Sequence, residues 1–150
     1  MGRQDWETPD DFFQICSKEF GPFTLDAAAT DYNYKCPRYY TPEVDAHKQN
    51  PTGETIWCNP PYGSLAPWIH TFICWSEHNK VVALLPCSVS PGWFGAVVHT
   101  ADLIYFLTPR INFVGTETGN RADSVLAVWQ SGVQSGPAEL FPWNWNLRKL

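Results

Sequence analysis

The sequence lacks the paired cysteines of a disulfide framework or a structural zinc site. Its five cysteines are odd in number and scattered, and they form no Cys-x-x-Cys pair. Cys74 and His78 lie one helical turn apart, but two more ligands are missing, so we expect no metal. We interpret the cysteines as the reduced thiols of a cytoplasmic protein.

Positive charge and long hydrophobic runs are also scarce. Lys and Arg total 10 against 15 Asp and Glu, which gives a net charge of −5. A chain of this charge has no overall attraction to nucleic acid, so any phosphate contacts must be local. No apolar run approaches the roughly 20 residues of a membrane span, and the N-terminus leads into no apolar signal segment. We therefore expect neither a membrane protein nor a tight autonomous DNA-binding protein.

Aromatic residues, by contrast, are abundant. The 150 residues include 8 Trp, 6 Tyr and 9 Phe, and 44% of the chain is hydrophobic. Such a chain packs a core and is not disordered, and its length suits one domain. We expect a single domain over residues 1–150, with its core at about 6–130. The tryptophan-rich tail at 137–150 is interpreted as a cover for a sheet edge.

The hydrophobic pattern alternates between strands and helices. Strands are predicted at residues 23–26, 55–58, 80–86, 103–107 and 124–129, with a weaker candidate at 38–41. A first helix is predicted with Thr8 as N-cap and Pro9 in its first position, and others after Ser64 and Ser90. This alternation is typical of an α/β fold with a mostly parallel sheet. We expect the last two strands to add an antiparallel hairpin at its edge.

A rigid turn follows the strand at 55–58. In Asn59-Pro60-Pro61-Tyr62, two prolines fix two backbone φ angles and remove two N–H donors, so the turn presents carbonyl oxygens and the Asn59 amide. At the carboxyl end of a strand in an open α/β sheet, such acceptors suit a substrate with an amino group, and Tyr62 offers a stacking face. An exocyclic base amine fits this description. The alternative is a plain proline-rich turn that closes a strand.

The chemistry of such an amine sharpens the interpretation. The amine of adenine is a poor nucleophile because its lone pair is delocalised into the ring. If the Asn59 side-chain oxygen and the Pro60 carbonyl each accept one N–H, the lone pair points out of the ring plane toward an electrophile. The positive charge that develops on the nitrogen is then stabilised, and no covalent enzyme intermediate is needed.

Three blocks of the sequence together resemble a known family. They are Trp6-x-Thr8-Pro9-x-x-Phe12-Phe13, then Phe23-Thr24-Leu25-Asp26-Ala27-Ala28-Ala29-Thr30 with Asp45-Ala46, then Trp57-Cys58-Asn59-Pro60-Pro61-Tyr62-Gly63. Over residues 6–130 the chain resembles the phage and prophage DNA N6-adenine methyltransferases of the Dam type. The Asn-Pro-Pro-Tyr motif alone is less specific, because enzymes that methylate cytosine N4, RNA amines or a protein glutamine amide share it.

The resemblance implies a shortened, Rossmann-like class I methyltransferase fold that binds S-adenosylmethionine and acts on DNA. It assigns catalysis to Asn59, Pro60, Pro61 and Tyr62. It also implies a set of cofactor contacts: Trp6, Thr8 and Pro9 at the methionine end, Asp26, Ala27 and Ala28 in place of the usual glycine-rich turn, and Asp45 at the adenosine. Asp31 is an alternative to Asp45 as the acid that binds the ribose.

The segment at 108–123 is the best candidate for DNA contact. Arg110, Asn112 and Arg121 stand on an expected hairpin near the active face, with further polar residues between them. A plain solvated loop is the alternative.

The expected activity is methyl transfer to the N6 amine of adenine in DNA, on a base flipped out of the duplex, inside a bacterial cell that carries the phage or prophage. One alternative is a methyltransferase for cytosine N4 or for an RNA or protein amide. The other is a catalytically silent nucleic-acid or protein binder, which the short cofactor region and the acidic charge would favour.

Overall fold

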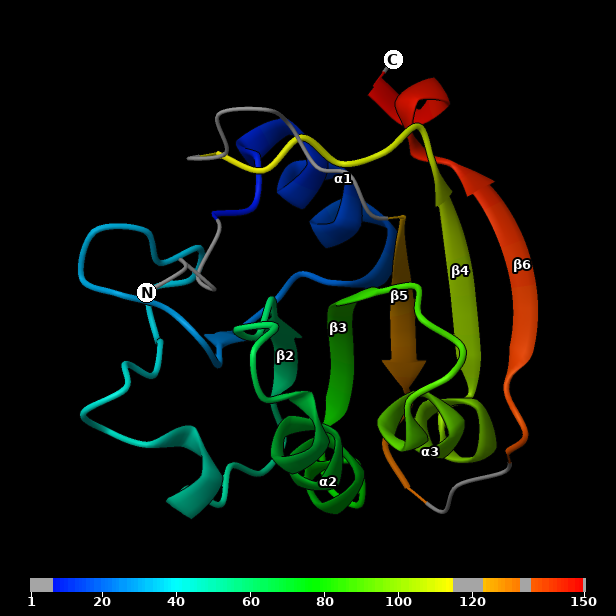
Figure 1. The fold of residues 1–150 in the computed structure, drawn as a ribbon. Helices are drawn as coiled ribbons and strands as arrows, with labels where there is room; N and C mark the ends of the chain where they lie inside the picture. The colour runs from blue at the N-terminus through cyan, green and yellow to red at the C-terminus, as the bar shows by residue number, and fades with distance from the viewer. Residues whose placement is uncertain (1–6, 115–122, 133–135, 150) are drawn as a thin grey trace.

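A single mixed sheet organises the molecule. The computed structural model describes residues 7–114, 123–132 and 136–149, and its six strands lie in the order β1-β2-β3-β5-β4-β6 (Figure 1). The strands are β1 (Leu25–Asp26), β2 (Thr55–Cys58), β3 (Lys80–Pro86), β4 (Leu103–Thr108), β5 (Ser124–Trp129) and β6 (Glu139–Asn144). The helices are α1 (Asp10–Phe20), α2 (Leu65–Trp75) and α3 (Gly92–Thr100), with short 3-10 turns η1 (Ala46–Lys48) and η2 (Trp145–Lys149). The expected α/β fold with a mostly parallel sheet is confirmed.

The order of the strands differs from the expectation in one detail. β1, β2 and β3 pair in parallel, and β4 and β6 pair in parallel, whereas β5 runs antiparallel to both of its neighbours. The expected antiparallel β4–β5 pair is therefore present, but β5 lies between β3 and β4 and not at the edge of the sheet. The tail supplies β6, which covers β4, so β4 does not form the edge of the sheet.

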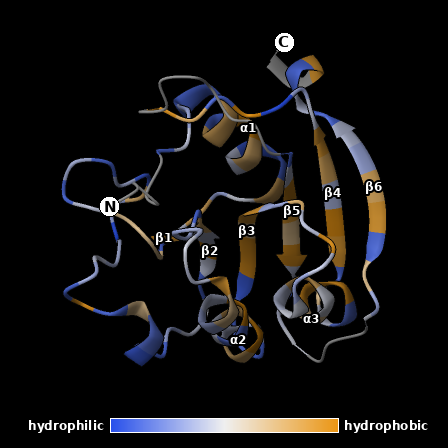
Figure 2. Cartoon of the chain, viewed as in Figure 1, coloured by the Kyte–Doolittle hydropathy of each residue, from blue (hydrophilic) through white to orange (hydrophobic). Residues whose placement is uncertain are grey.

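Two apolar layers cover the sheet, one on each face. Along β3 the side chains alternate: Val81, Ala83 and Leu85 pack in the layer that includes α2 and α3, whereas Val82 and Leu84 pack in the layer that includes α1 and η2. The hydrophobic colouring of β3 and β5 in Figure 2 shows why both faces need a cover. The result is a three-layer sandwich in which the middle strands are fully enclosed.

The start of α1 is a correction to the sequence-based expectation. The helix begins at Asp10 with Pro9 in the N-cap position, and no side chain caps it. Thr8 is therefore not the N-cap, since Pro9 is still extended, with ψ of 140°. Phe12, Phe13, Ile15 and Cys16 nevertheless form the buried face that attaches α1 to the sheet.

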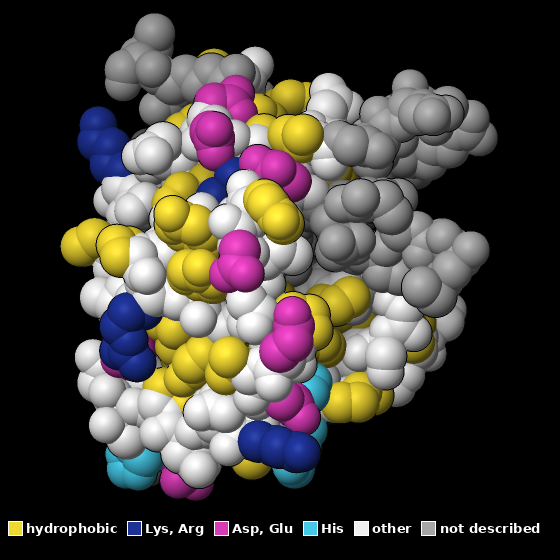
Figure 3. All heavy atoms as spheres, turned by 90° about the vertical axis from the view of Figure 1, so that its left-hand side faces the viewer, with side chains coloured by type: hydrophobic (Ala, Val, Ile, Leu, Met, Phe, Trp, Pro, Cys, Tyr) yellow, Lys and Arg dark blue, Asp and Glu magenta, His cyan; other side chains and the backbone are white. Residues whose placement is uncertain are grey.

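Residues 27–54 connect β1 to β2 with little regular structure. The expected strand at 38–41 is reduced to one parallel bridge between Tyr39 and Asp26, with hydrogen bonds from Asp26 N to Arg38 O (3.0 Å) and from Tyr40 N to Asp26 O (2.9 Å). This segment forms the side of the molecule that Figure 3 presents, where acidic and hydrophobic side chains are interspersed. Across the described ranges, no helix is long and apolar enough to cross a membrane.

Candidate active site

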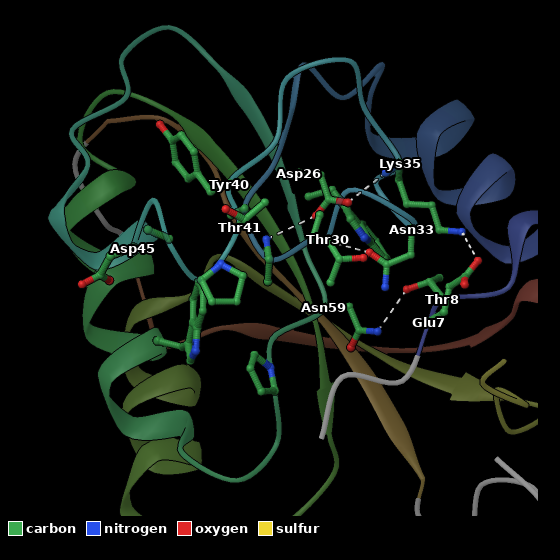
Figure 4. A pocket seen from close by; sticks show the side chains of 18 of the residues that line it. Glu7, Thr8, Asp26, Thr30, Asn33, Lys35, Tyr40, Thr41, Asp45 and Asn59 are labelled. Carbon is green, nitrogen blue, oxygen red and sulfur yellow. Dashed lines mark hydrogen bonds and ion pairs between the residues drawn. The ribbon is translucent and has the colours of Figure 1, made fainter. Parts of the chain in front are cut away.

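A cavity of about 420 Å³ opens beyond the carboxyl ends of β1 and β2. Its lining comes from several separate segments: the residues just before α1, the end of β1 with its following loop, the η1 region, the turn after β2 and the first turns of α2 (Figure 4). The lining includes Glu7, Thr8, Asp26, Ala27, Ala28, Lys35, Asp45, His47, Asn59, Pro61 and Trp68. The fold therefore brings parts of all three sequence blocks to one cavity, at the place where ligands of open α/β sheets bind.

Asp26 is the most deeply buried carboxylate of the cavity, with 3% of its surface exposed. Its two oxygens accept hydrogen bonds from the backbone N–H groups of Ala28 (3.3 Å) and Lys35 (3.0 Å), which folds the loop back over β1. Burial raises the pKa of Asp26 to about 6, although the two N–H groups and the charge of Lys35 act in the opposite direction. Asp26 thus supplies a negative charge that a bound cation would stabilise.

Lys35 connects the loop to the residues before α1. Its Nζ atom forms ion pairs with Glu7 (3.2 Å) and Asp10 (2.7 Å), and only 8% of its side chain is exposed. Glu7 also pairs through its backbone with Val114, in both directions (3.3 and 2.9 Å). The residue before Thr8 is therefore held by two contacts, the ion pair with Lys35 and the backbone hydrogen bonds with Val114.

Asn59 and Thr8 meet across 51 residues of sequence. The Nδ2 atom of Asn59 donates to the Oγ1 atom of Thr8 at 3.1 Å, and Thr8 is 3% exposed. Figure 4 shows this contact beside Glu7 and Lys35, at one end of the cavity. The structure therefore gives the Thr8 hydroxyl a partner in the proline turn in place of the helix cap that the sequence predicted.

The remaining residues of the proline turn are oriented differently. Pro61 lines the cavity with Asn59, whereas Pro60 and Tyr62 are not part of the lining. Tyr62 packs against both apolar layers, its ring meets Phe113 edge-on at 6.2 Å, and its hydroxyl lies 3.5 Å from the carbonyl of Leu84. Burial accordingly raises the pKa of the Tyr62 phenol. Within the turn Pro60 is buried, whereas Asn59, Pro61 and Tyr62 are half-buried.

The other end of the cavity is aromatic. The rings of His47 and Trp68 lie 4.4 Å apart, and His47 Nδ1 lies 2.7 Å from the Thr71 hydroxyl. Asp45 stands beside them with a positive φ of 61°, and its side chain accepts from the backbone N–H of His47 at 3.2 Å. In Figure 4 Asp45 lies on the opposite side of the cavity from Thr8 and Glu7.

The structure distinguishes the two carboxylates that were candidates for binding the ribose. Asp45 lines the cavity, whereas Asp31 is exposed outside it and accepts a hydrogen bond from the hydroxyl of Tyr39 at 2.8 Å. Pro9 does not line the cavity either, and Trp6 lies outside the described residues. Sequence reasoning missed Lys35, His47 and Trp68, because no local pattern distinguishes them from ordinary surface or core residues.

Residues 109–114 run past the same end of the cavity as Glu7. Ile111 and Phe113 are buried and Asn112 is exposed, as expected of an extended segment that lies on the core. Arg110 projects from it and pairs with Asp123 at 2.9 Å, with both side chains more than half exposed. Arg121 lies outside the described residues.

Among the residues that the structure describes, no group of three His, Cys, Asp or Glu side chains is placed to hold a metal ion.

The chain is similar to two proteins that are named as methyltransferases. The chain is 29% identical to a DNA N-6-adenine-methyltransferase of Escherichia phage T1 over 138 residues, which cover 81% of this chain and 58% of the phage protein. It is 36% identical over 69 residues to YfdM, a putative methyltransferase of Escherichia coli strain K12, covering 42% of this chain and 71% of YfdM. The chain thus spans less than two thirds of the length of the phage T1 protein.

A solved structure and a family model complete the comparison. A predicted O-methyltransferase of Agrobacterium tumefaciens, Atu636, superposes with a TM-score of 0.45 at 11% identity, over 91% of this chain and 87% of that one. The family model of DNA N-6-adenine-methyltransferase (Dam) matches residues 1–130. The chain belongs to the Dam family of DNA N-6-adenine-methyltransferases.

Proposed function

We propose that the protein transfers a methyl group from S-adenosylmethionine to the N6 amine of adenine in DNA. The observation that carries the proposal is the meeting of two sequence motifs at one cavity: Asp26 at the end of β1 and Asn59 at the end of β2 both line it. Family membership gives the reaction class. In the cavity, a bound cofactor would lie next to Asn59, which would bind the amine of the substrate.

The residues around the cavity fit this cofactor. A volume of about 420 Å³ lies in the range of small-molecule pockets, which is roughly 300–1,000 Å³. The carboxylates of Asp26 and Glu7 would hold the ammonium group of the methionine end, since both line the cavity and Asp26 is buried. The backbone of Ala27 and Ala28 would approach the same end closely, because small side chains leave the backbone accessible.

The opposite end fits an adenosine. Trp68 and His47 provide aromatic surface for the purine, and Asp45 stands beside them with a carboxylate suited to ribose hydroxyls. The cavity thus has carboxylates at one end, which suit the ammonium group of S-adenosylmethionine, and aromatic rings at the other end, which suit its adenine. When bound there, the cofactor supplies an electrophilic methyl carbon.

Asn59 and Pro60 would activate the substrate. The Asn59 side-chain oxygen and the Pro60 carbonyl each accept one N–H of the adenine amine, so the lone pair on N6 is directed out of the ring plane. These acceptors are fixed by the two prolines before the substrate arrives, which stabilises the positive charge that develops on N6. Pro61 would hold the turn against the cavity wall, and the extra proton on the methylated N6 would pass to solvent water.

The target base must leave the duplex to reach Asn59. Flipping costs a few kcal/mol of lost stacking and pairing, and the ring of Tyr62 offers a stacking surface beside the turn that offsets part of this cost. Arg110 and Asn112, with Arg121, would contact the DNA backbone from the segment after β4, since the net charge of −5 leaves only local contacts to attract phosphates. We place the reaction in the bacterial cytoplasm, where phage DNA resides.

Two measurements on the purified chain test the proposal. Calorimetry is expected to show binding of S-adenosylmethionine, and mass spectrometry of nucleosides from treated DNA is expected to show N6-methyladenine. Detection of N4-methylcytosine, or of methylated RNA or protein, would show that the enzyme methylates a different amine. Absence of cofactor binding would instead favour a silent binder that kept the fold.

A further inference from the structure

We propose that Asn33 binds the carboxylate at the amino acid end of the cofactor, so that the protein selects ligands in which this end is a complete zwitterion. The inference rests on the proposed function and deepens it. Asp26 and Glu7 suit the ammonium group of the methionine end, but they offer no hydrogen-bond donor to the carboxylate that is bonded to the same carbon atom. The loop that follows β1 contains the missing partner.

A ligand carboxylate at this end of the cavity needs hydrogen-bond donors close to it. Asp26 is 3% exposed, so a second negative charge beside it would be repelled and poorly solvated. Donors that face the ligand carboxylate offset this cost through charge-assisted hydrogen bonds. Three residues of the loop line the cavity and carry such donors: Thr30, Asn33 and Lys35.

The amide of Asn33 is oriented by a backbone contact. Its Oδ1 atom accepts a hydrogen bond from the backbone N–H of Thr30 at 2.8 Å. Because a backbone N–H can only donate, the opposite orientation of the amide would place two donors against each other. Nδ2 therefore lies at the other end of the amide, and Figure 4 shows it turned away from Thr30. Within the described ranges this contact is the only hydrogen bond of the Asn33 side chain, so the N–H groups of Nδ2 remain for a ligand.

The loop holds Asn33 close to Asp26. The loop is fixed at its start, where the backbone N–H of Ala29 donates to the carbonyl of Tyr40 at 2.9 Å. It is fixed at its end, where the backbone N–H of Lys35 donates to Asp26 at 3.0 Å. Asn33 is thus two residues from a backbone group that Asp26 itself binds. The two charged groups of an amino acid are separated by one carbon atom, so their partners must be neighbours of this kind.

Lys35 adds a positive charge to the same end of the cavity. Its side chain is only 8% exposed, and its Nζ atom pairs with Glu7 at 3.2 Å and with Asp10 at 2.7 Å. These ion pairs reduce the negative charge that a ligand carboxylate would meet. The amino acid end of the cavity therefore combines carboxylates with an amide donor and an ammonium group, as the recognition of a zwitterion requires.

Two ligands that differ only in the carboxylate test the inference on the purified chain. S-adenosylhomocysteine has no methyl group to transfer and carries both charges, whereas its decarboxylated form keeps only the ammonium. Titration calorimetry measures the Kd of each. For the wild type we expect the Kd of the decarboxylated form to be higher by about tenfold or more. Equal Kd values would overturn the inference, whether or not any variant folds.

Three variants assign the effect to Asn33. Asn33→Asp keeps an oxygen for the Thr30 N–H and replaces the donors of Nδ2 by a second oxygen. Asn33→Ala removes the donors without adding a charge. Asn50→Asp is the matched control: it adds the same negative charge at an exposed residue that does not line the cavity. The melting temperature of each variant reports whether the fold is kept.

We expect Asn33→Asp to raise the Kd of S-adenosylhomocysteine by about tenfold or more, and to leave the Kd of the decarboxylated form unchanged or lower. Asn33→Ala should raise the first Kd and not the second. Asn50→Asp should change neither Kd by more than about twofold, because salt screens an exposed charge. An equal change for both ligands in the Asn33 variants would overturn the inference, since Asn33 would then only support the loop.

The ligand pair also separates this inference from the proposed function. A wild type that methylates adenine N6 but binds both ligands equally would contradict the role of Asn33 alone. A wild type that prefers the ligand with the carboxylate but methylates no adenine would contradict the proposed function and leave the inference standing. A wild type that binds neither ligand would overturn both.

Discussion

The centre of the sheet and the wall of the cavity are built by different forces. In β3 and β5, residues 81–85 and 125–129 are all 0% exposed, and their stability comes from burial of apolar surface. In residues 26–48, side chains instead bind the backbone: Asp26 holds Ala28 and Lys35, and Asp45 holds His47. The first region specifies the fold through many small contributions, whereas the second specifies a binding shape through a few polar contacts. Substitutions should therefore separate stability from function according to region.

The largest expected effect comes from removing a tryptophan at the centre of the sheet. Trp129 is 0% exposed and packs on Phe72 at 5.6 Å. We expect Trp129→Ala to lower the free energy of unfolding by about 3–5 kcal/mol, measured by urea denaturation. The matched variant in the cavity is Trp68→Ala, which we expect to cost less stability and to weaken cofactor binding by about tenfold. An equal loss of stability in both variants would contradict the contrast between the regions.

The next largest effect is expected from a substitution in the turn after β2. We expect Asn59→Ala to lower kcat by about 10²–10³-fold, because a preorganised acceptor is lost at the reacting amine. Cofactor affinity measured by calorimetry should stay within a few-fold of the wild type, since the change removes no carboxylate or aromatic ring from the cofactor pocket. A variant that kept its turnover would remove Asn59 from the mechanism.

A smaller effect concerns the ionisation of Asp26. Its pKa is raised from 3.8 to about 6 by burial, so the folded protein binds a proton more tightly there than the unfolded chain does. The contribution of Asp26 to stability is therefore greatest below pH 3.8 and falls as the pH rises to about 6. A cationic ligand needs the ionised form, so cofactor affinity should fall by up to roughly tenfold for each pH unit below about 6.

The variant Asp26→Asn provides the control for this pH dependence. Its cofactor affinity should be weaker at pH 7 and nearly independent of pH between 5 and 7, since the titrating group is gone. Titration calorimetry over this range measures both. A wild-type affinity that stayed flat below pH 6 would show that Asp26 does not meet a cation in the complex.

The smallest effect is expected at the surface. Arg110 is exposed and forms an ion pair with Asp123, which partly neutralises its charge. We therefore expect Arg110→Ala to weaken DNA binding only a few-fold. If Arg110 contacts one phosphate, the slope of log K against log salt should become shallower by about 0.9. Fluorescence anisotropy with labelled duplex DNA at several salt concentrations measures the slope. An unchanged slope would place the phosphate contacts elsewhere.

The sheet centre was also the region that the sequence revealed best. The apolar run of β3, the helical spacing from Leu65 to Ile73 and the proline turn after β2 each carry a local signal, because burial imposes a period on the residues. The sequence predicted β5 and its antiparallel pairing with β4, but not the position of β5 between β3 and β4. No local pattern in the sequence indicates which strand lies beside β3.

The cavity wall was predicted only in part. Asp26 and Asn59 follow recognisable strands, so their convergence at the carboxyl ends of β1 and β2 could be foreseen. Lys35, His47 and Trp68 could not, because they reach the cavity through an irregular loop and a helix face whose placement depends on side-chain hydrogen bonds. Thr8 illustrates the same limit: locally it reads as a helix cap, and only the tertiary structure shows its contact with Asn59.

The most direct test of the account is made in cells. DNA from a bacterial host without adenine methylation of its own, expressing either the wild-type chain or Asn59→Ala, would be sequenced for modified adenines. The account predicts N6-methyladenine with the wild-type chain and none with Asn59→Ala at equal protein levels. Equal adenine methylation with both chains, or methylation confined to cytosine, would contradict it.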